Sequence, residues 1–573
     1  MEGGWMRWLA ALLLLLTVFS NVAVGAVYSA RLGLLAVEPG DMEGLVIYAR
    51  VELGPGSGGL VVEPGELVDE LLYVSTLVGF RVAALLSGVP PDWFNASVVI
   101  ETSQQVGGPS ASGFLSATFY DFLHGFTPRS SEVTMTGMVS LTGLVLNVAG
   151  VEQKLHAAAS RGFHVILVPA AEARPVEGVE VLPVCDVPDA ASLVAGAGAP
   201  AVPGAPIPVG AELPAAERFR EAALRFIGHA SRLLPLLPER EAESLNSTLR
   251  AARMMLEESP YAAASLAFST LYDAARLVST VHNFTAVERA LGVTLEDAMS
   301  EARAAVEDAR AAVLGGGSCD LWRLAALAAA AYRLHMAEVA AGSDEPLALL
   351  RALSAALWAR TVDGLRGPLV SCASAEAAAR FMVDYAETGL QYLRLLAQSR
   401  LIPAVANTTL GDWVRDARRA LEAGDWVTAL GLSVYVVSQI ESVLAHSTTP
   451  SCVLEHSRRL LSLAGGYALF PAAHFIDYAE AYLKANLTSV APPEAMVAFM
   501  GATASSWSLV VLAAEAYSKP APTAEAAPAA PSPAGGAAGL PAEAGYAVAI
   551  AAASLAALAS AAAARAAARR EVV

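Results

Sequence analysis

The chain has 573 residues, of which 55% are hydrophobic and 16% are charged, and its formal net charge is −18 at pH 7. At roughly 150 residues per domain this length predicts two to four domains, and the apolar content excludes a generally disordered chain. The acidic balance and the lack of clustered Lys and Arg argue against nucleic-acid binding, which requires basic surfaces. The mean hydropathy of +0.49 comes largely from scattered alanines, so a polytopic membrane protein does not follow.

The N-terminal residues 1–26 are typical of a secretory signal peptide. Arg7 precedes an uncharged apolar run over residues 8–19, and the small residues Val24-Gly25-Ala26 suit a cleavage site. An uncleaved N-terminal anchor is the alternative, although the apolar core is short for a membrane span.

Residues 27–195 change repeatedly between strand and helix patterns, which predicts an α/β domain. Residues 45–51 and 60–62 flank the glycine-rich segment 54–59, so we expect them to form a β-hairpin. The other expected strands are residues 97–100, 133–135, 144–146 and 165–168. The expected helices are residues 66–86, a segment from Gly107 to Leu123, and residues 151–160.

Beyond a Pro/Gly/Ala-rich linker at residues 196–213, residues 214–517 have helical spacing almost throughout. We expect nine to eleven helices, with breaks near Pro238, Gly315, Gly367, Pro403 and Pro450. The segments after Pro260-Tyr261 and Gly424-Asp425 share a turn followed by small residues, which is typical of stacked helical hairpins. An irregular helical bundle is the alternative. No metal-ligand pattern occurs among the dispersed histidines of this region, so we expect neither a metal nor a cofactor.

The C-terminal end predicts a linker followed by a membrane anchor. Residues 518–544 are rich in Ala and Pro and cannot bury enough surface to fold. Residues 545–564 carry no charge over about 20 residues, the length that crosses a bilayer. The basic tail 565–573 would then lie in the cytoplasm, and the bulk of the chain would be extracytoplasmic at the cell membrane. An Ala-rich soluble helix is the alternative.

The cysteines are compatible with an oxidising compartment, and they allow three disulfide pairings that the sequence cannot separate. They are Cys185, Cys319, Cys372 and Cys452. Five Asn-x-Ser/Thr triplets could accept glycans outside the cytoplasm, although such triplets also arise by chance. They begin at Asn95, Asn246, Asn283, Asn407 and Asn486.

The candidate catalytic serine, Ser110, lies in a turn between a predicted strand and a predicted helix. The turn has the sequence Gly107-Gly108-Pro109-Ser110. The hydroxyl of Ser110 would lie beside free backbone N–H groups at a helix N-terminus, and such groups can stabilise an oxyanion in acyl transfer. An ordinary helix start with serine as the N-cap is the alternative. The turn does not follow the G-x-S-x-G pattern of α/β-hydrolases.

Lys154 is the candidate base for Ser110. Lysine occurs elsewhere only at Lys484 and Lys519, because this chain uses arginine for positive charge. Burial among apolar neighbours would lower the pKa of Lys154 and make its amine a usable base. A solvated surface lysine is the alternative, and His124, His156 and His164 are other possible bases that no spacing favours.

Residues 108–169 resemble the proteolytic domain of Lon proteases, which are Ser-Lys dyad peptidases. Three motifs in family order carry the resemblance. They are Gly108-Pro109-Ser110-Ala111-Ser112-Gly113, Met135-Thr136-Gly137 and Ala149-Gly150-Val151-Glu152-Gln153-Lys154. Residues 44–64, and Asp69 within the following expected helix, are similar to archaeal stand-alone, ATPase-lacking, membrane-anchored Lon-like proteins.

The resemblance implies a role for each matched residue. Ser110 would be the nucleophile, Lys154 its base, and Thr136 would hydrogen-bond the lysine amine. Gly108 and Ala111 would support the nucleophile, and Ser112 is an alternative nucleophile. The chain departs from the family at Gly107, Met138 and Ala149, which affects substrate handling more than the dyad.

No phosphate-binding G-x-x-x-x-G-K-[ST] motif occurs in the chain. We therefore expect an ATP-independent serine endopeptidase that cleaves unfolded or flexible polypeptides. The alternative function is a non-catalytic cell-surface scaffold or binding protein built on a Lon-like domain. A homo-oligomeric ring is expected only by family resemblance, and the expected partners are polypeptide substrates and the membrane.

Overall fold

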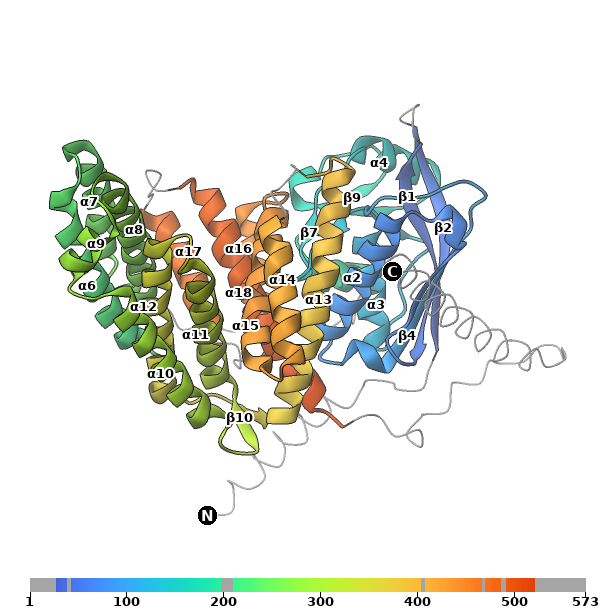
Figure 1. Ribbon diagram of the computed structural model, residues 1–573. Helices are drawn as coiled ribbons and strands as arrows, with labels where there is room; N and C mark the ends of the chain where they lie inside the picture. Colours follow the sequence, from blue (N-terminus) through green and yellow to red (C-terminus); the bar gives the residue numbers. More distant parts are fainter. Residues whose placement is uncertain are drawn as a thin grey trace, which may run out of the picture. The chain divides into compact units, whose positions relative to one another are not determined.

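The computed structural model describes residues 27–38, 43–196, 210–402, 408–465, 469–485 and 491–520. An α/β region comes first in the chain and a largely helical region follows it (Figure 1). The expected signal peptide 1–26 and membrane anchor 545–564 lie outside the described residues, as do most positions of both expected linkers.

One seven-stranded mixed sheet organises the α/β region, with the strand order β3-β4-β2-β1-β5-β8-β9. Strands β1, β5, β8 and β9 are parallel, β2 runs antiparallel to β1 and β4, and β3 is parallel to β4. The bounds are β1 Tyr28–Val37, β2 Gly44–Pro55, β3 Leu60–Glu63, β4 Phe94–Ile100, β5 Val133–Met135, β8 Val165–Pro169 and β9 Glu180–Val184.

The expected hairpin between β2 and β3 is wrong, because β4 lies between these two strands. The glycine-rich loop crosses the start of β4 instead of turning back on β2. The side-chain oxygen of Asn95 in β4 accepts hydrogen bonds from the backbone N–H groups of Ser57 and Gly59, each at 2.9 Å. Because these hydrogen bonds hold the loop against β4, β3 pairs with β4 on the edge away from β2.

The two faces of the sheet bury different sets of side chains, since successive residues of a strand point to opposite faces. Leu34 and Leu167 belong to the large core beneath α2 (Glu70–Leu86), α3 (Ser112–Leu123) and α5 (Val187–Ala195). Leu35 and Ile166 belong to a smaller core beneath α4 (Val151–Ser160) on the other face. From Leu32 to Val37, strand β1 is therefore a continuous apolar run instead of an alternating one, which is why the sequence did not reveal it.

The described residues of the helical region form thirteen α-helices, α6 to α18, which is more than expected. Several connections are only two to four residues long and end in a capping side chain, as at Asn283, Thr294 and Asp344. Such short connections are harder to find in the sequence than the breaks near Pro238 or Pro450. The bounds are α6 Ala216–Leu233, α7 Glu239–Met254, α8 Pro260–Val281, α9 Phe284–Leu291, α10 Leu295–Leu314, α11 Leu321–Ala340, α12 Glu345–Thr361, α13 Cys372–Gln398, α14 Thr408–Glu422, α15 Trp426–Ala445, α16 Pro450–Leu463, α17 His474–Ala485 and α18 Pro493–Ser518.

Two disulfides form among the four cysteines. Cys319 and Cys372 join at the small antiparallel pair β10 (Ser318–Asp320) and β11 (Leu369–Ser371) inside the helical region. Cys185 and Cys452 join the loop before α5 to the first turn of α16, and so link the α/β region to the helical region.

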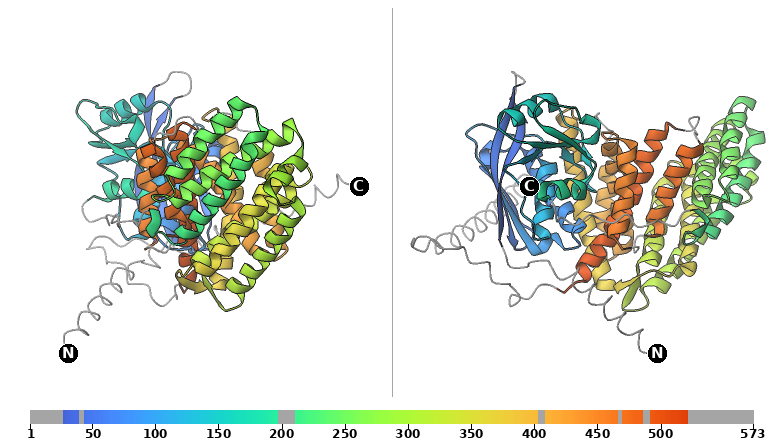
Figure 2. Two further views of the ribbon diagram at one scale, coloured as in Figure 1. Left: turned by 90° about the vertical axis from the view of Figure 1, so that its left-hand side faces the viewer. Right: turned by 180° about the vertical axis from the view of Figure 1, so that it is seen from behind.

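The helical region packs against the α/β region along α13, which lies beside α2 (Figure 1). The view from behind in Figure 2 shows the orange helices next to the teal strands. Strands β6 (Met138–Val139) and β7 (Val145–Leu146) form a hairpin that is buried at this contact. Tyr392 of α13 donates to the carbonyl of Val139 at 3.0 Å, and Tyr385 donates to that of Leu141 at 2.6 Å.

Two described helices, α15 and α18, are long and apolar enough to cross a membrane by length and composition alone. Each is mostly buried against other helices of the same region. Core helices of soluble proteins have the same properties, so these two helices are weak evidence of membrane association.

Candidate active site

Ser110 lies in the turn that enters α3. Gly108 adopts a left-handed backbone conformation with φ of +85°, which glycine tolerates without strain. The N-cap of α3 is Ala111, and its side chain makes no capping hydrogen bond. Ser110 is half-buried, and its hydroxyl makes no hydrogen bond to any described residue. The Ser110 side chain therefore does not cap α3.

Ser112, the alternative nucleophile, occupies a different environment two residues later. It is fully buried, its hydroxyl donates to the carbonyl of Pro109 at 2.7 Å, and its oxygen accepts from the N–H of Val139 at 3.0 Å. These bonds hold the turn to strand β6. Ser112 therefore has a structural role, and Ser110 is the serine whose hydroxyl is free to react.

Lys154 lies in the first turn of α4, with its side chain only 3% exposed. The helix begins after Gly150, whose φ is +68° and where a Cβ atom would lie 2.5 Å from Cγ2 of Val37. The amine forms no ion pair or hydrogen bond within the described part of the chain. Burial without a counter-ion lowers the pKa of Lys154 from 10.5 to about 8.

The three histidines considered as bases lie elsewhere. Nδ1 of His124 is 2.8 Å from the carbonyl of Tyr120 in its own helix, and His156 and His164 are exposed. None of them lines the cavity that Ser110 faces.

Thr136 supports the serine instead of the lysine. Its hydroxyl donates to the carbonyl of Ser110 across a long 3.5 Å, and Gly137 donates its N–H to the same carbonyl at 2.9 Å. Within the described residues no hydrogen bond joins Thr136 to Lys154, contrary to the expectation from the resemblance. The Met-Thr-Gly segment therefore fixes the backbone of the nucleophile turn.

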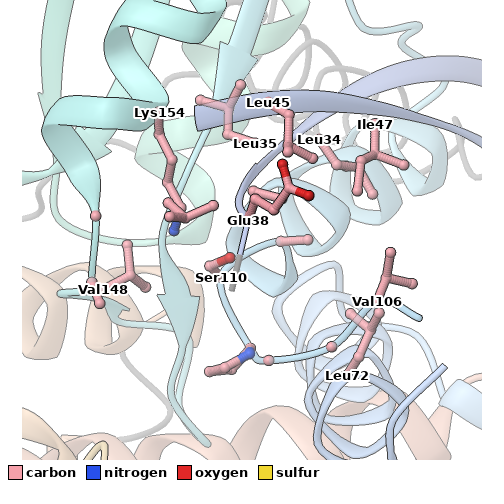
Figure 3. Close-up of a pocket in the computed structure, with 18 of the residues that line it drawn as sticks. Leu34, Leu35, Glu38, Leu45, Ile47, Leu72, Val106, Ser110, Val148 and Lys154 are labelled. Atoms are coloured by element: carbon pink, nitrogen blue, oxygen red, sulfur yellow. The ribbon is translucent and has the colours of Figure 1, made fainter. Parts of the chain in front are cut away.

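Ser110 and Lys154 line one cavity of about 840 Å³ (Figure 3). Figure 3 shows the lysine reaching down from α4 and the serine on its turn, both facing this space. Most of the wall is apolar. It includes Leu34, Leu35, Leu45, Ile47, Leu72, Val106 and Val148. The cavity combines apolar walls with a few polar groups, as ligand-binding sites commonly do.

Several residues of the cavity carried no signal in the sequence. Glu38, at the end of β1, points its carboxylate into the space near the dyad (Figure 3). Arg400, Leu401 and Ser447 come from the helical region. Ser447 also accepts a hydrogen bond through its carbonyl from the N–H of Asn147 at 3.1 Å. No local motif could have revealed the residues of the helical region, because they lie about 250 to 340 positions from the dyad along the chain.

Residues 94–183, which include Ser110, Thr136 and Lys154, match the family model of the Lon protease (S16) C-terminal proteolytic domain. The chain contains a Lon-type proteolytic domain. The helical region lies outside the matched residues.

Curated proteins named as Lon proteases are similar to the same part of the chain. The Lon protease of Phenylobacterium zucineum (strain HLK1) is 34% identical over 134 residues, which are 22% of this chain and 16% of that protein. Lon protease 2 of Sorangium cellulosum (strain So ce56) is 33% identical over 141 residues, 24% of this chain and 17% of that protein. A mitochondrial Lon protease homolog of Oryza sativa subsp. indica is 29% identical over 164 residues, 27% of this chain and 16% of that protein. The chain thus spans about one sixth of the length of the curated relatives it matches.

The Lon-type domain departs from the family motif at Gly107, and the structure explains why. A Cβ atom at this position would lie 1.9 Å from Oδ2 of Asp69, so only glycine fits. That oxygen accepts a hydrogen bond from the N–H of Gly108 at 3.0 Å. A carboxylate therefore lies beside the nucleophile turn, and Asp69 at the N-cap of α2 supplies it.

A second departure, Met138, belongs to the hairpin that the helical region covers. Beyond Met138, the buried carboxylate of Glu441 in α15 accepts hydrogen bonds from the hydroxyls of Ser140 and Thr142, each at 2.7 Å. Thr142 also contacts Nε2 of His456 at 3.0 Å, and Nδ1 of His456 lies 3.2 Å from Asp186. The helical region thus fixes the segment that connects the Met-Thr-Gly motif to the lysine helix.

Proposed function

We propose that this chain is a membrane-anchored, extracytoplasmic serine endopeptidase that cleaves unfolded or flexible polypeptides without ATP. The observation that carries the proposal is the shared cavity of Ser110 and Lys154, in which the lysine is buried and has no counter-ion among the described residues. A lysine in that environment is neutral in a substantial fraction of molecules near pH 8, and a neutral amine can accept a proton.

In the proposed reaction the hydroxyl oxygen of Ser110 attacks the scissile carbonyl carbon while the amine of Lys154 takes the hydroxyl proton. The protonated amine then gives this proton to the departing peptide amine, which leaves an ester on Ser110. Water then attacks the ester carbon while Lys154 takes a proton from it. The bond between that carbon and the Ser110 oxygen breaks, the serine oxygen takes the proton back from Lys154, and the peptide leaves with a new carboxyl terminus.

Backbone N–H groups are available for the oxyanion of each tetrahedral intermediate. The N–H of Gly108 is committed to Asp69. The N–H groups of Ser110 and Ala111 make no hydrogen bond within the described structure, and they lie at the positive end of α3. These two amides are the proposed oxyanion donors.

In the proposed domain organisation, residues 27–195 form the peptidase domain and residues 214–517 form a helical domain that completes one wall of the cleft. The two disulfides support an extracytoplasmic location, since disulfides persist in oxidising compartments. Signal peptide, anchor and basic tail at 1–26, 545–564 and 565–573 are proposed from the sequence alone. The lack of a nucleotide-binding motif in the chain supports ATP independence.

The proposal is tested with the full-length protein in detergent micelles, incubated with fluorescein-labelled casein. We expect hydrolysis without nucleotide, no change on adding Mg-ATP, and no cleavage of a tightly folded substrate. Hydrolysis only with Mg-ATP would contradict ATP independence. No hydrolysis by a folded, disulfide-bonded sample would favour the scaffold function.

A further inference from the structure

A second cavity, of about 220 Å³, lies wholly inside the helical region and has no part in the peptidase site. Aromatic side chains from seven helices make up much of its wall. They are Phe219, Phe226, Tyr261, Phe268, Tyr332, Trp358, Tyr435, Phe475, Phe499 and Trp507. Two arginines, Arg333 and Arg351, are the charged side chains that line it in the described structure, and no carboxylate lines it.

Arg333 is a buried cation without an acidic partner. Its side chain is only 9% exposed, and its guanidinium lies 4.6 Å from the ring centre of Tyr332 and 4.7 Å from that of Trp358. One N–H donates to the carbonyl of Ala329 at 2.8 Å. The side chain also hydrogen-bonds the hydroxyl of Tyr332. A guanidinium has five N–H donors and a full charge, so the aromatic rings, one carbonyl and one hydroxyl compensate its burial only partly.

Arg351, on α12, adds a second cation to the same cavity. It lies 5.9 Å from the ring centre of Phe268, and its Nε is buried without a hydrogen-bond partner. In this region some arginines pair with carboxylates, as Arg310 does with Asp425 and Arg418 with Glu387. Others, such as the exposed Arg250 and Arg276, form no ion pair with any described residue. The chain has 55 acidic side chains against 37 basic ones. Arg333 and Arg351 differ from the exposed unpaired arginines because both line a cavity and Arg333 is buried. Neither has an acidic partner among the described residues, so an anion from outside the protein would compensate their charge.

We propose that this cavity binds a small organic carboxylate whose apolar group fills the aromatic pocket. The two guanidinium groups would bind the carboxylate through paired N–H donors, a geometry that arginine provides and lysine does not. The volume is below the roughly 300–1,000 Å³ of drug-sized sites, so the ligand is compact. Two sources supply this chemistry: the C-terminal residue of a polypeptide, or a free small aromatic or aliphatic acid. The inference does not depend on the proposed peptidase activity.

The test is isothermal titration calorimetry on the full-length protein in detergent, with N-acetyl-L-phenylalanine and its uncharged amide as a matched pair. We expect the acid to bind at least about tenfold more tightly than the amide, since hydrogen bonds between a guanidinium and a carboxylate are stronger than those to a neutral amide. Arg351→Met should weaken binding of the acid at least about tenfold. The control Arg276→Met removes the same charge from an exposed position on α8 and should leave binding unchanged.

Arg351→Lys controls for unfolding of the Met variant, because it keeps the positive charge but loses the paired N–H donors. It should bind N-acetyl-L-phenylalanine with an affinity between those of wild type and Arg351→Met. A blocked tetrapeptide ending in a free phenylalanine carboxylate and phenylacetate distinguish the two sources. Preference for the peptide identifies a polypeptide C-terminus as the ligand, and preference for phenylacetate identifies a free acid. Equal binding of acid and amide, unchanged affinity in a folded Arg351→Met protein, or no binding up to about 10 mM would overturn the proposal.

Discussion

The carboxylate of Asp69 joins helix α2 to the N–H of Gly108, with 3.0 Å between Oδ2 and the backbone nitrogen. Its other oxygen caps α2 by accepting from the N–H of Leu72 at 2.7 Å. The Asp69 side chain therefore fixes the turn that ends at Ser110, and it also caps the N-terminus of α2.

This relationship predicts that Asp69→Ala will affect peptide hydrolysis more than stability. Loss of the helix cap costs about 1 kcal/mol, and loss of the bond to Gly108 frees the nucleophile turn. We expect kcat to fall about tenfold or more, since small displacements of catalytic groups are costly. Asp344→Ala is the matched control, because Asp344 caps α12 in the same way far from the site. Equal kcat values for the two variants would contradict this role.

Lys154→Met is predicted to stabilise the protein at pH 7 while abolishing hydrolysis. The pKa of Lys154 falls from 10.5 in the unfolded chain to about 8 in the folded one, so its burial as a cation opposes folding. The two pKa values differ by about 2.5, and each pKa unit corresponds to about 1.36 kcal/mol. Removing the charge should therefore raise the free energy of unfolding by about 3 kcal/mol.

The sign of the pH dependence gives a second check on Lys154→Met. Between pH 8 and pH 10.5 the unfolded chain holds a proton that the folded chain has lost, so the wild-type protein gains stability across this window. The advantage of the variant should therefore shrink from pH 8 to pH 10.5 in urea unfolding experiments. Lys484→Met, at an exposed lysine of α17, should change stability little at either pH. A destabilised Lys154→Met at pH 7 would mean that the lysine is not buried as a cation.

The rate of hydrolysis should follow the same ionisation. The base must be neutral to accept the proton of Ser110, so kcat/KM should rise about tenfold per pH unit below pH 8 and level off above it. Measurement from pH 6 to pH 10 with a quenched peptide checks this. A rate that is constant from pH 6 to pH 9 would exclude Lys154 as the base.

Much of this arrangement follows from sequence signals that are local. The glycine-proline turn, the Met-Thr-Gly segment and the lone lysine each lie in a short window, and the structure brings Ser110 and Lys154 to one cavity. The pairing of β2 with β4 could not be read from the chain, because it depends on the side chain of Asn95 holding a loop about 40 residues away. Thr136 was assigned to the lysine from the resemblance alone, whereas its hydroxyl faces the carbonyl of Ser110.

The role of the helical region was also beyond sequence reasoning, since it rests on contacts between residues about 300 positions apart. Glu441 is buried, and burial raises its pKa, yet it accepts hydrogen bonds from the hydroxyls of Ser140 and Thr142 in the hairpin.

We predict that Glu441→Ala will lower both the thermal midpoint and kcat, because each buried donor left unpaired costs about 1–3 kcal/mol. Glu441→Gln keeps an acceptor and should have a smaller effect.

Glu422→Ala, at the exposed end of α14, is the control for this network. It should leave the thermal midpoint and kcat unchanged. If Glu441→Ala lowered the thermal midpoint but left kcat at the wild-type value, the helical region would stabilise the Lon-type domain without organising its active site.

The central claim is that Ser110 and Lys154 act together, and one assay tests it most directly. Hydrolysis of casein without ATP is compared among wild type, Ser110→Ala, Lys154→Met and two controls, Ser103→Ala and Lys484→Met, at exposed positions. We predict that each dyad variant loses at least about a thousandfold in kcat/KM while both controls keep wild-type rates. Full activity in either folded dyad variant would contradict the account.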